Sequence, residues 1–362
     1  MSWIAALDRW LVTSRERAID VLRDPASFTV EDPRFSTGQV LGPSMLSLDG
    51  PEHRRHRSPF TELAGQDTTV QEEATRHVET IAPRGRAELR TELAGPYAAS
   101  VIARVLGLDL VTTRSNGNPA GAVEVLTWYR AIVAAVTEVD AGRAVAESAI
   151  VAIEQLRDTV GSAAASPNGF LARPAAALAS EELFSNVAVL LFGAIETVEA
   201  MITNALHHLL TNPAQHAAVE ANPTLLAGAL EESLRLEPGA AIVDRYTTRP
   251  VVLGGTTIPA GDLVSVSLTG ANRDPRSFPD PDRFDPERTN ASRHLAFVTG
   301  PHACLGARLA RAEAMALITT LIARCPKLTI DPSASDAPSG FIFRKPARLT
   351  VTWTLSRDRE RP

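Results

Sequence analysis

FVTGPHACLG, residues 297–306, is the stretch on which the interpretation of this chain depends, because it places one of only two cysteines in a loop between glycines. A structural cysteine is more often a small buried apolar side chain inside a helix or a strand. Cys304 instead precedes the helical pattern LGARLARAEAMALITTLIA. A helix that begins here directs its N-terminal dipole and free N–H groups at the sulfur, which favours the thiolate. The loop is therefore a candidate metal site, and a plain buried cysteine is the alternative.

The residues around this cysteine narrow the choice of metal. Zinc and iron–sulfur clusters need several Cys or His ligands at short spacing, and only His302 lies close to Cys304 in the sequence. Haem iron needs a single axial thiolate. Gly300 and Gly306 would let the backbone approach a flat macrocycle closely. The other cysteine, Cys325, stands at the end of a predicted helix and is interpreted as structural.

The composition excludes several classes of protein. The chain carries 36 Lys+Arg against 42 Asp+Glu, a net charge of -6, and 44% hydrophobic residues, enough for a substantial core. This mild acidity argues against a nucleic-acid binder, which would carry a basic stripe. Two cysteines cannot form a disulfide framework, which fits a reducing cytoplasm. No signal peptide and no window of roughly 18 uncharged apolar residues is visible, so we expect a soluble cytoplasmic protein without a membrane segment.

The order of the patterns predicts a mainly α fold with small antiparallel β-sheets near the two ends. WLVTS, residues 10–14, predicts a strand and is followed by a helical pattern that stops at Asp24-Pro25, while alanine-rich helical patterns dominate residues 68–235. Residues 250–268 alternate β-branched side chains around Gly and Pro turns, which is typical of hairpins, and FIFRKPARLTVTWTL near the end repeats this alternation. FPDPDRFDPER, residues 278–288, is too rich in proline and acid for a regular element. We expect residues 1–362 to form one domain.

Five residues of the cysteine loop together resemble the haem-binding signature of the cytochrome P450 superfamily, whose soluble bacterial members are haem-thiolate monooxygenases: Phe297, Gly300, His302, Cys304 and Gly306. The resemblance implies the cytochrome P450 fold and heme b, with Cys304 as the axial ligand of the iron. Val298 departs from the signature, which usually has glycine at this position. Because a β-branched residue restricts the turn, we expect the local geometry of the loop to differ.

A second segment, EESLRLEPG, places Glu232 and Arg235 three residues apart on one helix face. Taken alone, such a pair is usually a solvated surface ion pair worth a fraction of a kcal/mol. In the family that the chain resembles, this pair is buried and interlocks with an arginine of the irregular segment before the cysteine loop. Arg283 is the candidate for that arginine.

The longest predicted helix, residues 181–210, is apolar nearly all round but carries Glu196 and Thr197 at its centre. Thirty helical residues span about 45 Å, long enough to cross a domain. A buried carboxylate costs several kcal/mol unless it is paired or hydrated. The structural interpretation is that Thr197 hydrogen-bonds the carbonyl four residues earlier and that Glu196 faces a polar neighbour.

The functional interpretation of this helix uses the same geometry. The stretch resembles the acid–alcohol pair in the P450 helix that crosses the haem. The resemblance implies that Thr197 loosens the helix at Gly193 and Ala194, where dioxygen and water bind, and that Thr197 hydrogen-bonds them. Glu196 would then pass protons inward. The apolar residues expected to face the substrate are Val189, Phe192 and Ala194.

The haem propionates need cations, and three further segments supply them. His53 and Arg57 in DGPEHRRHR lie four residues apart on one helical face and resemble the His-x-x-x-Arg propionate clamp of the family. Arg245, in VDRYTTRP, and His302 match further propionate ligands. Four more arginines predict a basic patch on the thiolate side that steers an acidic electron donor, although each could be an ordinary solvated side chain: Arg54, Arg55, Arg308 and Arg311.

The implied activity is insertion of one oxygen atom from dioxygen into a small organic substrate in bacterial secondary metabolism, with electrons from ferredoxin and ferredoxin reductase. Two alternatives stay open: a haem-thiolate enzyme of another type (bond coupling, rearrangement or peroxide-driven oxidation) and a non-catalytic haem-binding homologue. The N-terminal part and the segment 34–50 are short for the family. We therefore expect an open active site that accepts a bulky or carrier-bound substrate or is closed by another chain.

Overall fold

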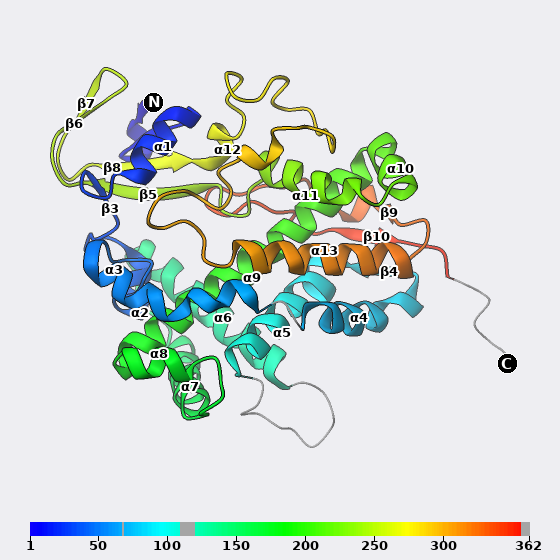
Figure 1. Ribbon diagram of the computed structural model, residues 1–362, viewed down its shortest axis with the longest axis horizontal. Coiled ribbons are helices and arrows are strands. Elements are labelled where there is room, and N and C mark those ends of the chain that lie inside the picture. The colour runs from blue at the N-terminus through cyan, green and yellow to red at the C-terminus, as the bar shows by residue number, and fades with distance from the viewer. Residues whose placement is uncertain (67–68, 109–119, 356–362) are drawn as a thin grey trace.

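Helices make up most of the computed structural model, which describes residues 1–66, 69–108 and 120–355 (Figure 1). A small sheet of β4 Arg86–Glu88, β9 Thr329–Ile330 and β10 Thr350–Thr352 lies beside them at the right. The helices lie below and to the right in this view, and the strands near the N-terminus lie at the upper left. The helices of eight or more residues are α1 Arg15–Arg23, α3 Gly50–Arg57, α4 Val70–Ile81, α5 Gly95–Leu106, α6 Ala120–Asp140, α7 Glu147–Ala164, α9 Ser180–Thr211, α10 Pro213–Ala221, α11 Leu225–Leu236 and α13 Ala307–Arg324. The shorter ones are α2 Ser36–Leu41, α8 Ala172–Ala177 and α12 Leu268–Ala271.

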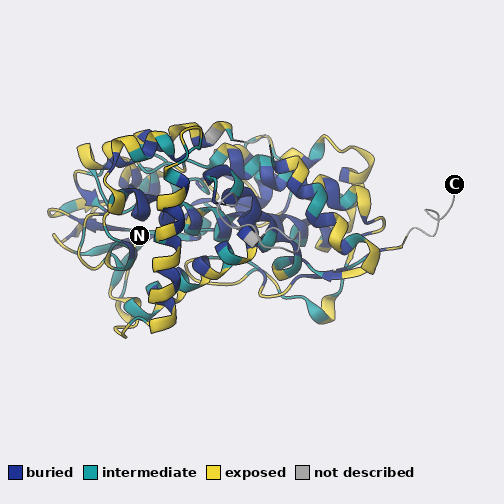
Figure 2. Cartoon of the chain, turned by 90° about the horizontal axis from the view of Figure 1, so that it is seen from below, coloured by how far each residue is buried: buried dark blue, intermediate teal, exposed yellow. Residues whose placement is uncertain are grey.

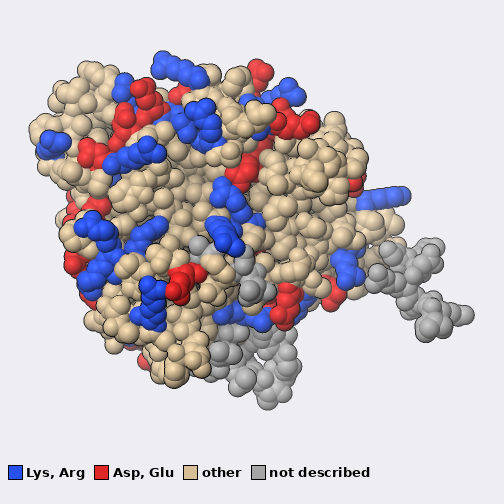
Figure 3. Space-filling view, viewed as in Figure 1, with Lys and Arg blue, Asp and Glu red and all other residues tan. Residues whose placement is uncertain are grey.

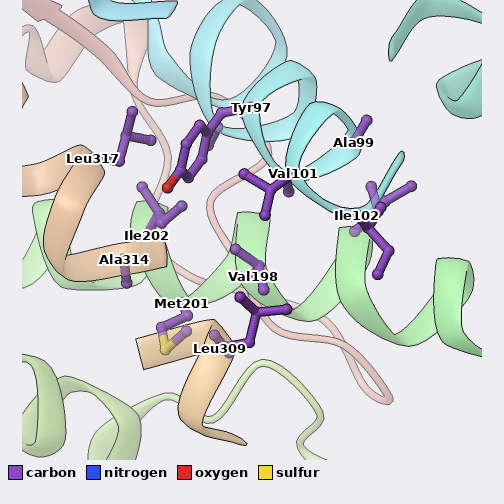
Figure 4. Close-up of a cluster of buried hydrophobic side chains, with 14 of the residues drawn as sticks. Tyr97, Ala99, Val101, Ile102, Val198, Met201, Ile202, Leu309, Ala314 and Leu317 are labelled. Carbon is purple, nitrogen blue, oxygen red and sulfur yellow. The ribbon is translucent and has the colours of Figure 1, made fainter. Parts of the chain in front are cut away.

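Helix α9 is the central element of the helical part and packs against α5, α6, α11 and α13. It spans 32 residues and buries side chains on most of its circumference, which confirms that it is a core helix. Figure 4 shows Val101 of α5, Val198 and Met201 of α9, and Leu309 of α13 in one apolar cluster. Among the described residues, α9 is the one helix long and apolar enough to cross a membrane by length and hydropathy, although Glu196 and Glu199 interrupt its apolar run. Its apolar surface is instead covered by the other helices.

Three small sheets form the β-rich part. The five-stranded sheet has the order β1-β2-β8-β5-β3, the second sheet the order β4-β10-β9, and the third is the hairpin β6-β7. The pairs are antiparallel as predicted, except that β2 and β8 run parallel, with Trp10 opposite Val264. The strands are β1 Ser2–Ile4, β2 Arg9–Val12, β3 Phe28–Thr29, β4 Arg86–Glu88, β5 Ile242–Thr247, β6 Val251–Leu253, β7 Thr256–Ile258, β8 Leu263–Ser267, β9 Thr329–Ile330 and β10 Thr350–Thr352.

Two separate apolar cores hold these parts together. The larger core joins the helices around α9, and a smaller one packs α1 against the five-stranded sheet through residues such as Val21, Leu22 and Val264. Figure 2 shows the buried residues along the inner sides of the elements and the exposed residues outside. The cysteine loop runs between the two cores, because Phe297 packs against the larger one and Val298 against the smaller.

The predicted Glu232–Arg235 pair is a buried anchor for the irregular segment before the cysteine loop. Both side chains are fully buried, and Arg235 Nε lies 2.6 Å from Glu232 Oε2. The arginine that completes the cluster is Arg288, whose Nε lies 2.9 Å from Glu232 Oε1. The choice of Arg283 was wrong: its side chain is 64% exposed, and only its backbone carbonyl accepts hydrogen bonds from the two buried arginines. The Asp285–Arg288 turn, which is closed by a backbone hydrogen bond, brings the later arginine back onto α11.

We predict that Arg288→Ala lowers the free energy of unfolding by about 3–5 kcal/mol, because it leaves Glu232 buried with one partner fewer. Arg283→Ala is the matched control from the same segment and should stay within about 0.5 kcal/mol of the parent protein. Urea unfolding followed by circular dichroism measures both. Equal effects of the two substitutions would contradict the assignment of Arg288.

Candidate active site

The cysteine loop is a tight turn with a strained residue at its start. Cys304 donates its backbone N–H to the carbonyl of Phe297 at 2.9 Å, which brings the two ends of the loop together. Val298 has φ 60°, a left-handed conformation that β-branched residues rarely adopt. The loop thus keeps the kind of turn that glycine permits, and holding valine in it costs about 1–3 kcal/mol.

Gly300 is required for packing against α1. Its φ is +81°, and an added Cβ would stand 2.4 Å from the carbonyl oxygen of Leu22. Arg23, the last residue of α1, donates from Nε to the hydroxyl of Thr299 at 3.2 Å. The contact that excludes a side chain at Gly300 is therefore with the end of α1. An added Cβ at Gly306 would meet nothing within 4 Å. Of the two glycines in the loop, Gly306 is therefore the one that faces open space.

Cys304 is exposed at the end of the loop, yet the surrounding chain strongly desolvates its sulfur. Burial raises the pKa of the thiol, and the Gly306 N–H, Arg57 and Arg311 act in the opposite direction. Our expectation that the helix N-terminus makes the thiolate the favoured form was wrong for the chain alone, because the desolvation is larger than the gain from one N–H and two cations. A metal ion at the sulfur would supply the missing stabilisation, since coordination deprotonates a thiol outright.

Helix α3 directs its two predicted cationic residues at the cysteine loop. The rings of His53 and His302 lie 4.3 Å apart, and Arg57 donates to the carbonyl of Ala303 at 2.6 Å. His302 Nε2 lies 2.8 Å from Asp49 Oδ1, the residue at the N-cap of α3. Burial would raise the pKa of Asp49, but hydrogen bonds from His302, Val30 and Thr29 lower it to about 2.

Two of the predicted propionate ligands, Arg245 and His53, are buried without a carboxylate hydrogen-bonded to them. Arg245 is buried on β5, and its guanidinium donates only to the backbone carbonyl of Asp244 at 2.7 Å. Burial lowers its pKa, although the charges of Asp49 and Asp244 act in the opposite direction. Among the described residues, neither carboxylate is in hydrogen-bond contact with the guanidinium. His53 Nε2 is buried without a hydrogen-bond partner, and burial together with the charges of His302 and Arg57 lowers the pKa of His53 to about 4. Such groups are stable inside a protein only if a ligand satisfies them.

The centre of α9 has the hydrogen bond that the sequence predicts. Thr197 Oγ1 donates to the carbonyl of Gly193 at 2.6 Å. Gly193 is exposed although the helix is central, and an added Cβ there would meet nothing within 4 Å. The helix remains α-helical through this point, so it is not interrupted. The open space lies beside Gly193 because the residue has no side chain.

Glu196, three residues after Gly193 on the adjacent part of the helix surface, is held by groups from two other segments. Tyr129 of α6 donates its hydroxyl to Glu196 Oε2, and Lys345 Nζ lies 2.6 Å from Glu196 Oε1. These contacts agree with the structural interpretation of the sequence, in which Glu196 faces a polar neighbour. No hydrogen bond between Glu196 and Thr197 is recorded among the described residues.

The predicted substrate contacts lie around α9 on either side of Gly193. At 3.6 residues per turn, Phe192 and Ala194 flank Gly193, and Val189 lies one turn before it. Val189 is 8% exposed, whereas Phe192 and Ala194 are half-buried. The ring of Phe192 lies 5.5 Å from that of Phe343, which therefore borders the same region. Their role toward a substrate stays a prediction.

The basic patch is weaker than expected, because at least two of its four arginines are ion-paired. Arg55 binds Glu52 and Glu182, and Arg311 binds Glu231. On the face of the molecule seen in Figure 3, Lys and Arg side chains lie interspersed with Asp and Glu. Arg54 and Arg308 of the patch are exposed.

Sequence reasoning missed several residues of the site. Lys345 binds both Glu196 and Glu199, and Arg90 binds Glu199. Asp49 binds His302, and Phe343 contacts Phe192. Asp49 carried a signal, because Asp-Gly-Pro before a helical pattern is typical of an N-cap. Lys345 is one of only two lysines in the chain, but nothing in the sequence relates it to Glu196.

Taken together, these residues fit a haem held by one thiolate. The described residues contain no group of three or more His, Cys, Asp or Glu side chains that could hold a metal ion, which disfavours a zinc or cluster site. Cys304 offers one exposed sulfur, Gly193 leaves open space in the core helix, and Arg245 and His53 are buried cationic or donor groups that need an anion.

Comparisons with known proteins agree with this fit. The family model of the cytochrome P450 family matches residues 168–345. The chain is 36% identical to cytochrome P450 monooxygenase PikC of Streptomyces venezuelae, over 96% of this chain and 86% of that protein. It also resembles the solved structure of HmtN, a post-tailoring hydroxylase involved in himastatin biosynthesis, with TM-score 0.83, 26% identity and coverage of 98% and 93% of the two chains. The structure of P450BioI in complex with an acyl carrier protein ligated to hexadec-9Z-enoic acid matches with TM-score 0.82 and 26% identity, over 95% and 92%.

We predict that Gly300→Ala destabilises the protein by about 2 kcal/mol or more, because the new methyl group meets the Leu22 carbonyl at a backbone conformation that disfavours alanine. Gly161→Ala in α7, where an added Cβ meets nothing within 4 Å, is the control and should be neutral or stabilising by up to about 1 kcal/mol. Thermal unfolding of both variants is the measurement. A Gly300→Ala protein as stable as the parent would show that the loop does not pack on α1.

Proposed function

We propose that this chain, which belongs to the cytochrome P450 family of oxidoreductases, inserts one atom of dioxygen into a small organic substrate in bacterial secondary metabolism. The reaction consumes dioxygen, two electrons and two protons, and one oxygen atom enters the substrate while the other leaves as water. The observation that carries the proposal is the combination of the loop cysteine Cys304 with Arg245 and His53, which are buried without a hydrogen-bonded carboxylate. The relationship to PikC and HmtN supports the same chemistry.

Five residues would hold the cofactor. Cys304 Sγ would bind the iron, and the propionates would be received by Arg57, Arg245, His53 and His302, because these groups converge on the cysteine loop or are buried without a hydrogen-bonded carboxylate. Gly193 would leave room for the macrocycle against α9. When bound, a thiolate-ligated haem supplies the iron chemistry that activates dioxygen.

The chain's own contribution to the sulfur is electrostatic. The Gly306 N–H donates to Cys304 Sγ, and the positive charges of Arg57 and Arg311 lie near it. All three stabilise negative charge on the sulfur. The guanidinium of Arg311 also lies 4.3 Å from the centre of the Phe297 ring, so the same cation fixes the start of the loop.

Thr197 is placed to handle protons beside the open face of α9. Its hydroxyl now donates to Gly193, and rotation of its Cα–Cβ bond would turn the oxygen toward the open side. The carbonyl of Thr197 lies against Gly239, where an added Cβ would come within 3.0 Å. The backbone there is therefore fixed while the hydroxyl can exchange partners, which suits general acid–base work.

The substrate, the electron donor and the compartment are part of the proposal. The short segment 34–50 includes α2, which packs against α6 and α9, and this supports a substrate that enters beside a small cap. P450BioI was solved with an acyl carrier protein, so a carrier-bound substrate fits the family. The exposed arginines Arg54 and Arg308 support a ferredoxin with its reductase as donor. A cytoplasmic location fits such a donor.

We predict that Cys304→Ser abolishes the long-wavelength absorbance band of the reduced carbon-monoxide complex, because a hydroxyl cannot replace the thiolate ligand. Cys325→Ser is the matched control: that cysteine is buried at the end of α13, and burial raises its pKa to about 11, so its loss should leave the band in place. If the parent protein, loaded with haem, shows no such band, the proposed function fails.

We predict that Thr197→Ala increases the hydrogen peroxide released per NADPH by up to about tenfold, and clearly above the parent value, since the hydroxyl that positions protons is gone. The measurement uses the haem-loaded protein with ferredoxin, its reductase and air. Thr203→Ala is the control, because Thr203 makes the same kind of bond to the carbonyl of Glu199, at 2.8 Å, in a buried part of α9. An unchanged peroxide yield in Thr197→Ala would remove Thr197 from the proposal.

A further inference from the structure

A single lysine joins two carboxylates on the side of α9 that carries Glu196. Lys345 Nζ lies 2.6 Å from Glu196 Oε1 and 2.6 Å from Glu199 Oε1. The three side chains are only 10–15% exposed. Lys345 is fixed by its backbone, which pairs with Ser339 in an antiparallel bridge, and Pro346 follows it. The ammonium therefore reaches α9 from a rigid segment distant in sequence.

Two further groups complete this cluster. Tyr129 donates to Glu196 Oε2, and Arg90 Nε donates to Glu199 Oε1 at 2.9 Å. Glu199 also packs closely against the backbone of Gly95, since its Oε2 would stand 2.6 Å from a Cβ added there. Two cations thus oppose two carboxylates, and one hydroxyl binds the carboxylate nearer to Thr197. We call these five side chains the Lys345 cluster: Arg90, Tyr129, Glu196, Glu199 and Lys345.

The cluster borders a cavity of about 380 Å³ between α5, α6 and α9. Its walls combine the charged groups of the cluster with apolar residues of α6 such as Leu126 and Val133. Arg130 also lines the cavity and is exposed. A polar cavity of this size admits many water molecules. Solvent therefore reaches the Glu196 carboxylate from one side of α9, while Gly193 and Thr197 occupy the adjacent face.

A cation suits this position better than a neutral residue, and lysine provides one. Its ammonium is a compact point charge with three donors, which can bind two carboxylates at once. Without a cation, Glu196 and Glu199 would repel each other across the space that Lys345 now fills. Glu196 would then be free to leave Tyr129 and the cavity. The chain otherwise uses arginine almost everywhere, since Lys327 is its other lysine.

We propose that Lys345 is a positioning residue for proton supply, which holds the Glu196 carboxylate between the cavity and Thr197. The inference rests on the proposed function and adds to it a residue outside the cysteine loop and α9. Protons enter from solvent in the cavity, pass to Glu196 beside Tyr129, and continue toward Thr197 at the next position of the helix. Glu199 and Arg90 balance the charge of Lys345 and keep it in place.

The share of dioxygen that is reduced to hydrogen peroxide rather than to water reports this role. The measurement needs no known substrate. Reduction of dioxygen to hydrogen peroxide takes two electrons and two protons, whereas reduction to two water molecules takes four of each. NADPH, through ferredoxin and its reductase, supplies the electrons. A chain that positions its proton donor poorly releases more of the oxygen as peroxide, so peroxide per NADPH rises.

The experiment compares Lys345→Met and Lys345→Arg in the haem-loaded protein, with dioxygen as the only oxidant. We expect Lys345→Met to raise peroxide per NADPH by about threefold or more. Lys345→Arg keeps a cation able to bind two carboxylates and should stay within about twofold of the parent. Lys327→Met is the matched control, because that lysine is exposed, and it should leave the yield unchanged.

A second measurement separates positioning from a purely structural role. Thermal unfolding of Lys345→Met, alone and with Glu199→Gln, tests whether the loss of stability comes from the unbalanced carboxylates, and the double variant should regain most of the lost stability. Tyr129→Phe removes only the hydroxyl on Glu196. It should raise the peroxide yield in the same direction, which keeps the test open if Lys345→Met does not fold.

The inference is overturned if Lys345→Met folds and its peroxide yield equals that of the parent, or if Lys345→Arg behaves like Lys345→Met. It is also overturned if Lys345→Met does not fold and Tyr129→Phe leaves the yield unchanged. These results differ from failure of the proposed function. If the proposed function fails, the parent protein itself lacks the reduced carbon-monoxide band, and the variants are not informative.

Discussion

The need to give every buried charge a partner shapes this molecule more than any other constraint. An ionised group taken out of water costs several kcal/mol unless an opposite charge or several hydrogen bonds replace the solvent. The chain satisfies this need internally at Glu232, whose carboxylate binds Arg235 and Arg288. At Arg245 it does so incompletely, because the guanidinium donates to a backbone carbonyl and burial outweighs the charges of Asp49 and Asp244. The first arrangement stabilises the fold, and the second requires a ligand.

Helix α9 shows the same constraint within one element. It must be apolar to lie at the centre of the helical part, yet it carries Glu196 and Glu199 within one turn. The conflict is resolved by directing both carboxylates to one side, where Lys345 and Arg90 offset their charge. The neighbouring face can then be left to Gly193 and Thr197. A polar face and an open face therefore coexist on a helix that is otherwise buried.

Sequence reasoning succeeded where helical periodicity fixes neighbours and failed where separate segments meet. His53 and Arg57, or Gly193 and Thr197, are four residues apart, so one turn of helix brings them together whatever surrounds them. The choice of Arg283 failed because the segment around it has no regular period, and a tight turn presents Arg288 instead. The pairs Lys345–Glu196 and Asp49–His302 escaped notice for the same reason, since the two residues of each pair lie more than a hundred residues apart in the chain.

Val298 shows how packing can maintain a backbone that local sequence disfavours. Its left-handed φ costs about 1–3 kcal/mol for a β-branched residue, and glycine would avoid that cost. Glycine, however, would lose the contact of the side chain with the smaller core and would leave the unfolded chain more flexible. Burial of part of a valine side chain contributes about 1 kcal/mol, so these effects nearly balance. The strained residue thus ties the position of the Cys304 loop to the packing of α1 on the sheet, a coupling that a glycine would not provide.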